Sequence, residues 1–195
     1  MVRHDERVPR VTLEQFHAFR DERPKEEKWE LIDGVMTMMP PPALTHQRIS
    51  KNLETLLNVR LAAVRPIWEA DREIGVLLPK DERYNPEPDV VVIDRDYRPG
   101  QIYAERFYFV AEVRSPNDKP VILDLKRGYY QAHEHCRGVL FVDQETIGAT
   151  LMVRDGDVWS THELTRPADR VSIPDIGEIG TLGQLYRSTP LAPQA

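Results

Sequence analysis

The sequence of 195 residues contains a single cysteine, Cys136, and no long run of apolar residues. One cysteine cannot form a disulfide or a cysteine-based zinc site within one chain, so a bound metal would need oxygen or imidazole ligands. The longest apolar runs, at residues 90–93 and, with interruptions, at 107–113, are far shorter than the roughly 20 residues that a membrane helix needs. No apolar segment follows the charged N-terminus, as it would in a secretory signal. We therefore expect a cytoplasmic protein with no membrane contact.

Several catalytic motifs are also missing. The sequence has no glycine-rich phosphate loop, no H-E-x-x-H zinc motif and no G-x-S-x-G nucleophile turn. Its formal net charge of −6 argues against a protein that binds nucleic acid through bulk positive charge. A nuclease is not excluded, because acidic side chains can hold divalent cations that bridge to phosphates.

Hydrophobic residues make up 41% of the chain, which is enough to bury a core without disulfides. Their spacing predicts the order of the elements. These are a helix from residue 13 that ends before Pro24, a hairpin over 29–39, a helix over 45–64, strands within 67–78, 88–93 and 107–113, a helix from about 120 to 136, a strand at 138–143, a hairpin over 149–162 and a short helix near 182. This order predicts an α/β (α+β) fold in which helices flank a mixed β-sheet.

Short motifs mark the ends of these elements. Asp33-Gly34 is the dipeptide that a tight type I′ hairpin turn prefers. Polar residues before the helices are candidate N-terminal caps. They are Thr12 together with Gln15, then Thr45, and then Asn117 or Asp118.

Two acidic residues occupy strands in which a charge is costly. Asp89 begins one apolar strand and Glu112 lies near the end of another. Alternation along a strand places Glu112 on the face of Tyr108, Val110 and Arg114. If the two strands are neighbours, both carboxylates can point into one pocket and share a divalent cation. The alternative is that each carboxylate pairs with its own arginine, and Arg114 lies two residues from Glu112.

Several segments, taken in order, carry a resemblance to a known family. They are W-E-L-I-D-G at 29–34, M-P-P-P at 39–42, H-Q-R-I-S at 46–50, P-D-V-V-V at 88–92, A-E-V-R-S-P at 111–116, and Lys126 with Tyr130. Over residues 12–185 they resemble the Uma2 family of restriction-endonuclease-like proteins. The resemblance implies a PD-(D/E)XK nuclease core with additional hairpins. From the length of the chain we expect a single domain over 12–187, between a charge-rich flexible arm at 1–11 and a flexible tail at 188–195.

The resemblance implies roles for three acidic residues. Asp89 and Glu112 would be the metal ligands. Glu30 could complete the acidic cluster directly or through water. The alternative for Glu30 is a solvated side chain that faces out of the hairpin.

The position of the catalytic lysine departs from the general superfamily pattern. The third residue of the E-x-K motif is Arg114, which stays protonated and could hold a phosphate but could not act as a base. The resemblance instead implies Lys126 on the following helix, with Tyr130 four residues later. The alternative is an ordinary solvated lysine. Ile122 occupies a position where the family usually has aspartate.

His46 begins the long helix. It could contact a phosphate or assist the reaction, or it could be an ordinary histidine near a helix N-terminus.

These residues lead to one functional hypothesis and one alternative. The hypothesis is an endonuclease that hydrolyses DNA with Mg²⁺ or Mn²⁺ bound by Asp89, Glu112 and the carbonyl oxygen of Val113, while Lys126 orients or deprotonates water or stabilises charge. The alternative, motivated by Arg114 and Ile122, is a catalytically inactive nucleic-acid-binding or interaction module on the same fold. A symmetric homodimer would suit an enzyme that cuts both strands of a duplex.

Overall fold

The computed structural model describes residues 10–78 and 81–192. Most of the arm predicted at 1–11, namely residues 1–9, lies outside the described residues. Residues 193–195 of the predicted tail also lie outside them.

Within the described part of the chain, the centre of the fold is a six-stranded mixed sheet with the order β10-β9-β8-β7-β5-β3. Its strands are β3 (Trp68–Asp71), β5 (Val90–Asp94), β7 (Phe107–Arg114), β8 (Gly138–Asp143), β9 (Ala149–Asp155) and β10 (Val158–Leu164). β7 and β8 are parallel, and the other neighbouring pairs of this sheet are antiparallel. A parallel pair needs a crossover connection, which is supplied by helix α3 (Pro120–Ala132).

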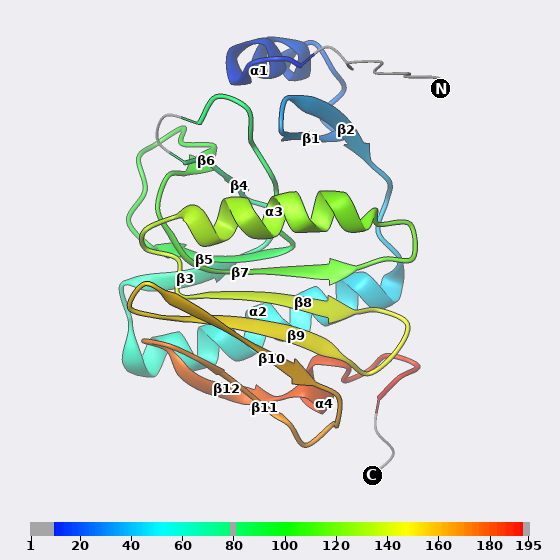
Figure 1. The fold of residues 1–195 in the computed structure, drawn as a ribbon, viewed down its shortest axis with the longest axis vertical. Helices are drawn as coiled ribbons and strands as arrows, with labels where there is room; N and C mark the ends of the chain where they lie inside the picture. Colours follow the sequence, from blue (N-terminus) through cyan, green and yellow to red (C-terminus); the bar gives the residue numbers. More distant parts are fainter. Residues whose placement is uncertain (1–9, 79–80, 193–195) are drawn as a thin grey trace, which may run out of the picture.

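Helices cover both faces of this sheet, as the sequence predicted (Figure 1). α3 lies over one face. Helix α2 (Leu44–Val64) lies on the other face, together with β11 (Arg170–Ile173), β12 (Gly177–Thr181) and the short helix α4 (Leu182–Leu185). The predicted mixed α/β architecture is therefore confirmed.

Alternation along the central strands divides the core into two layers. Val90, Val92 and Val113 belong to the cluster that packs against α2. Val91 and Val110 belong to the cluster that contains residues of α3. Side chains two residues apart on a strand point to the same face of the sheet. Asp89 lies two residues before Val91 and Glu112 two residues after Val110, so both acidic residues belong on the α3 side.

A second unit of structure brings the N-terminal part of the chain to this side. It contains α1 (Leu13–Asp21), the hairpin of β1 (Lys28–Ile32) and β2 (Val35–Met39), and the small parallel pair β4 (Gly75–Val76) and β6 (Tyr103–Ala104). The predicted turn is confirmed, since Asp33 and Gly34 both have positive φ, 49° and 76°. Paired backbone hydrogen bonds between Leu31 and Asn85 fix the hairpin beside the segment that leads into β5.

The predicted caps are only partly right. Thr12 and Gln15 form the expected capping box. Thr45 does not cap α2, because the helix already begins at Leu44 after Ala43. Lys119 precedes α3, and Asp118 instead accepts hydrogen bonds from the backbone and hydroxyl of Ser115, which closes the turn after β7.

Two further details differ from the sequence-based expectation. The pairing of β5 with β7 shifts between Val92 and Ile93, so Tyr108 is the extra residue of a bulge. Tyr108 therefore stacks on Trp68 in the α2-side core and does not share the face of Glu112. The second is the β11–β12 hairpin, which the sequence did not predict and which contains an internal bulge.

None of the helices in the described residues has the length and apolar character needed to cross a bilayer.

Candidate active site

Asp89 and Glu112 meet where β5 begins and β7 ends. The two strands are antiparallel neighbours, with Val90 opposite Ala111. Asp89 Oδ2 accepts a hydrogen bond of 2.6 Å from the backbone N–H of Val113, the residue after Glu112. The two acidic residues therefore converge, as the sequence predicted.

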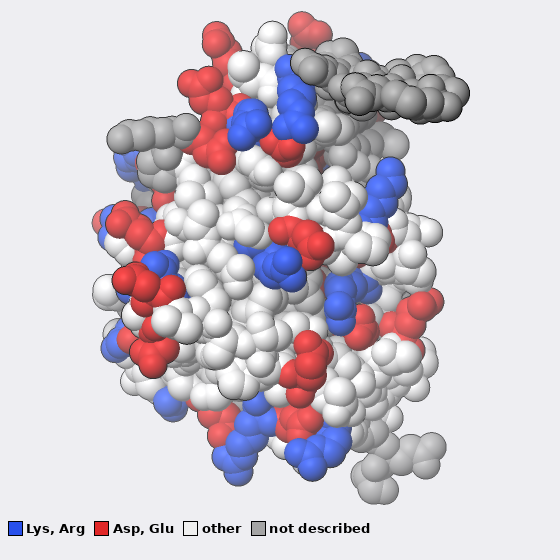
Figure 2. Space-filling view, viewed as in Figure 1, with Lys and Arg blue, Asp and Glu red and all other residues white. Residues whose placement is uncertain are grey.

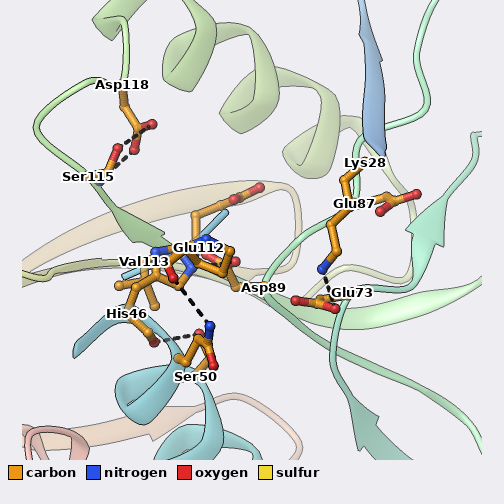
Figure 3. A network of polar contacts seen from close by, with 12 residues as sticks. Lys28, His46, Ser50, Glu73, Glu87, Asp89, Glu112, Val113, Ser115 and Asp118 are labelled. Carbon is orange, nitrogen blue, oxygen red and sulfur yellow. Dashed lines mark hydrogen bonds and ion pairs between the residues drawn. The ribbon is translucent and has the colours of Figure 1, made fainter. Parts of the chain in front are cut away.

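Both carboxylates line a pocket of about 230 Å³. Figure 3 shows Asp89, Glu112, Val113 and His46 gathered at one place in this region, with Lys28, Glu73 and Glu87 on another side. The described residues that line the pocket are Lys28, Met39, Pro40, Pro41, Pro42, Ala43, His46, Glu73, Glu87, Asp89, Glu112, Val113, Ser115, Asn117, Asp118, Leu123 and Gln144.

His46 contacts Asp89 directly. Its Nε2 lies 2.7 Å from Asp89 Oδ1, so the two oxygens of Asp89 are held by two different partners, a histidine of α2 and a backbone amide of β7. Burial alone lowers the pKa of His46, but the hydrogen bond to Asp89 and the charges of Asp89 and Glu112 raise the pKa overall. The arrangement therefore favours the protonated form of His46 more than the surroundings of an ordinary exposed histidine do.

Lys126 reaches the same site from α3. Its ammonium group donates to Glu30 Oε1 at 2.7 Å and to Glu112 Oε1 at 3.1 Å. Glu30 and Lys126 are both nearly inaccessible to solvent, at 2% and 3% exposure. The alternatives of a solvated glutamate and a solvated lysine are thereby excluded. Glu30 is the partner of Lys126, and its Oε1 also accepts the backbone N–H of Glu87.

Tyr130 completes this buried network. Its hydroxyl donates to Glu112 Oε1 at 2.5 Å. Burial raises the pKa of Glu112, and Asp89 and Glu30 raise it further, whereas Lys126 and Tyr130 oppose the rise. Within the described residues, the hydrogen bonds to the Glu112 side chain end on Oε1, which leaves Oε2 for another partner.

The protonation state of Lys126 limits what it can do. Burial lowers the pKa of its ammonium group, but the charges of Glu112 and Glu30 outweigh burial and raise the pKa above its usual value. A lysine that stays charged can neutralise negative charge or orient a ligand. It is poorly suited to accept a proton.

Arg114 lies outside this network. Its Nε lies 2.9 Å from Asp143 Oδ1, and it lines a neighbouring surface hollow with Leu123 and Arg127. Among the described residues, neither Asp89 nor Glu112 forms an ion pair with an arginine. The alternative in which each acid has its own guanidinium therefore does not apply.

Three acidic residues of the pocket were not assigned to the site from the sequence, namely Glu73, Glu87 and Asp118, which was considered only as a helix cap. Glu73 forms an ion pair with Lys28. Burial, with a contribution from Glu30, raises the pKa of Glu87 to about 7. A signal for Glu87 was present, because it stands two residues before Asp89 and so shares its side in an extended segment. Glu73 lies in a turn with a positive φ of 59°, and no sequence motif predicts this turn.

The donor atoms fit a hard divalent cation better than a zinc-type site. Among residues 10–78 and 81–192, no group of three or more His, Cys, Asp or Glu side chains is placed to hold one ion. Two carboxylates that face the same pocket are the oxygen donors that Mg²⁺ or Mn²⁺ accepts, with backbone oxygen and water as the remaining ligands.

Comparisons with known proteins agree with this fold. A crystal structure of a putative nuclease belonging to DUF820 from Anabaena variabilis ATCC 29413 is similar, with a TM-score of 0.70 and 18% sequence identity over 90% of this chain and 97% of that chain. At that identity the likeness shows the fold alone. A comparison with curated proteins gives no match. The model of the Uma2 family, described as "Putative restriction endonuclease", matches residues 13–181. The resemblance seen in the sequence is thereby confirmed, and the chain belongs to the Uma2 family.

Proposed function

We propose that the protein is an endonuclease that hydrolyses DNA phosphodiester bonds with the help of Mg²⁺ or Mn²⁺. The observation that carries this proposal is the 2.6 Å hydrogen bond from Val113 N–H to Asp89, which sets the Asp89 and Glu112 carboxylates side by side in one pocket. Membership of a family whose description is "Putative restriction endonuclease", and a fold shared with a protein described as a putative nuclease, support the same chemistry.

The proposed ligands of the cation are Asp89, Glu112 and the carbonyl oxygen of Val113. A bound divalent cation supplies Lewis-acid stabilisation of the charge that develops on a phosphate during hydrolysis. His46 and the Val113 amide hold the Asp89 carboxylate in place, which is the usual task of groups behind a metal ligand.

Lys126 contributes a fixed positive charge. Glu30 and Glu112 hold its ammonium group beside the carboxylates, and a preorganised charge of this kind stabilises a developing anion without having to reorient. Tyr130 donates to Glu112 and so fixes the rotamer of that carboxylate. Glu30 acts in this proposal through Lys126.

Incubation with supercoiled plasmid tests the proposal. We expect nicking or linearisation in the presence of Mn²⁺ or Mg²⁺, and loss of at least about a hundredfold in rate for Asp89→Ala, because removal of a ligand disrupts the cation site. The matched control is Asp96→Ala, which removes an exposed acid that lies outside the pocket. Cleavage that persists in Asp89→Ala would contradict the assignment.

A second candidate is a non-catalytic nucleic-acid-binding module on the same fold. The observation that favours it is that protein donors already engage both acids, with His46 on Asp89 and Lys126 on Glu112. Calorimetric titration separates the two candidates. An endonuclease should bind Mn²⁺ more tightly than its Asp89→Ala variant does, whereas an inactive module should show no difference.

A further inference from the structure

The pocket that holds Asp89 and Glu112 is lined by two kinds of side chain. One kind is acidic, and Glu112 among them is recessed, with 6% exposure. The other kind is apolar. It comprises Met39, Pro40, Pro41, Pro42 and Ala43 from the connection between β2 and α2, and Leu123 from α3. Because proline has a fixed φ, the segment of three prolines has little backbone freedom to lose when a ligand binds.

The positive charges at the pocket are already paired with acidic groups, His46 with Asp89 and the buried Lys126 with Glu30 and Glu112. Of the described residues that line it, one is a lysine or arginine, Lys28, and its ammonium group is already paired with Glu73. The chain as a whole carries a formal charge of −6. Figure 2 shows basic and acidic side chains interspersed on the face that carries α3, with no continuous basic band there.

These features disfavour an intact duplex as the preferred ligand. Duplex DNA is held mainly through lysine and arginine contacts to many phosphates, which this pocket does not provide. The bases of a duplex are stacked on one another, so their faces are not available to the apolar residues of the pocket. An unpaired nucleotide exposes both its phosphate and the face of its base, and proteins pack such faces against aromatic or apolar side chains. Methionine, leucine and proline also contact base faces where a protein inserts them between partly unstacked bases.

Building on the proposed endonuclease function, we propose that the pocket takes an unpaired DNA nucleotide, from a single strand or an open loop in a duplex. The phosphate lies toward Asp89 and Glu112 through the divalent cation, and the base packs against Met39, Pro41 and Leu123. Selectivity for unpaired over paired nucleotides comes from the apolar residues of the pocket, because the carboxylates and the cation bind any DNA phosphate equally.

Binding measurements test this inference separately from cleavage. Fluorescence anisotropy would compare labelled DNA of one sequence as a single strand, as a full duplex and as a duplex with a central unpaired loop. Ca²⁺ would replace Mn²⁺ as an oxygen-preferring ion. We expect the single strand and the loop to bind at least about tenfold more tightly than the duplex. Met39→Ser should weaken single-strand binding several-fold.

Met38→Ser is the matched control, since Met38 is the neighbouring residue on β2, is 54% exposed and does not line the pocket. It should bind DNA as the unmodified protein does. Equal or tighter binding of the duplex, or equal effects of the two methionine variants, would overturn the inference. If the protein still cleaves plasmid and this cleavage depends on Asp89, the proposed endonuclease function stands without the inference. If the protein cleaves neither plasmid nor single-stranded DNA, both the proposed function and the inference are wrong.

Discussion

At the scale of single residues, Asp89 is the side chain on which the site converges. Its two oxygens contact groups from two other elements, His46 on α2 and the Val113 amide on β7. A carboxylate with both oxygens fixed loses little conformational freedom when it binds a cation. Only a proline at position 113 would remove the backbone amide, and it would also disrupt β7, so His46 is the partner through which this arrangement can be tested.

We expect His46→Ala to weaken Mn²⁺ binding by about 10- to 100-fold, the usual effect of removing a group that orients a metal ligand. His46→Gln keeps a hydrogen-bond donor and should recover part of the loss. Isothermal titration calorimetry measures both constants. An unchanged affinity in His46→Ala would show that Asp89 needs no support from α2.

Glu87 should make the stability of the metal-free protein depend on pH. Its folded-state pKa of about 7 lies above the ordinary value of 4.5, so the folded protein binds the extra proton. The stabilisation is complete below about pH 4.5 and is lost as the pH rises through about 7, with a magnitude on the order of 1–3 kcal/mol. Urea denaturation across this range should show the decline, and Glu87→Gln should make it smaller, with the remainder due to Glu112, whose pKa burial also raises. A decline of the same size in Glu87→Gln would contradict this origin.

At the scale of elements, the β1–β2 hairpin is what delivers Glu30 to the site. Its turn requires positive φ at Asp33 and Gly34. Gly34 also lies close to the segment that precedes α1, because an added Cβ would come within 2.8 Å of Arg10 Cβ and 3.2 Å of the Val11 carbonyl oxygen. The geometry of this turn therefore controls both the hairpin and its contact with the N-terminal segment.

Gly34→Ala should destabilise the protein by about 1–2 kcal/mol, because alanine is strained at positive φ and its methyl group meets the Arg10 backbone region. Gly128→Ala is the matched comparison. Gly128 lies within α3, where an added Cβ meets nothing within 4 Å, so this variant should be more stable by about 0.5–1 kcal/mol. Thermal denaturation distinguishes the two, and equal effects of the same sign would refute the argument.

At the scale of the whole molecule, the C-terminal segment packs on the α2 side of the sheet and is fixed there by Tyr186. Tyr186 is fully buried after α4, and its hydroxyl lies within 2.9 Å of the carbonyl oxygens of Asp143, Thr146 and Gly148. It also accepts the N–H of Gly148 at 3.1 Å. The turn between β8 and β9 is thus tied to the last helix of the chain.

Tyr186→Phe should lower the free energy of unfolding by about 1–3 kcal/mol, because it leaves a buried N–H and carbonyl groups without this partner. The carboxylates proposed to bind the cation, Asp89 and Glu112, are on the α3 side of the sheet, whereas Tyr186 belongs to the core on the α2 side, so metal affinity at low temperature should not change. Denaturant titration and calorimetry measure the two quantities. A loss of metal affinity without a loss of stability would contradict this division of roles.

The sequence by itself determined the central elements and the family. Period-two and helical spacing fixed the central strands and the two long helices, since these patterns depend on neighbours a few residues apart. The Asp33-Gly34 turn and the Thr12 capping box were predictable for the same reason. The family resemblance and the alternation of side chains along the two strands were enough to predict that Asp89 and Glu112 share one pocket.

Only the tertiary structure decided which groups these acids contact. Glu30 and Lys126 are 96 residues apart in the chain, and His46 and Asp89 are 43 apart. Such pairings depend on how α3, α2 and the hairpin pack around the sheet, and no local pattern contains that information. The bulge at Tyr108 and the position of Glu73 were decided in the same way, by strand register and a turn that the sequence does not mark.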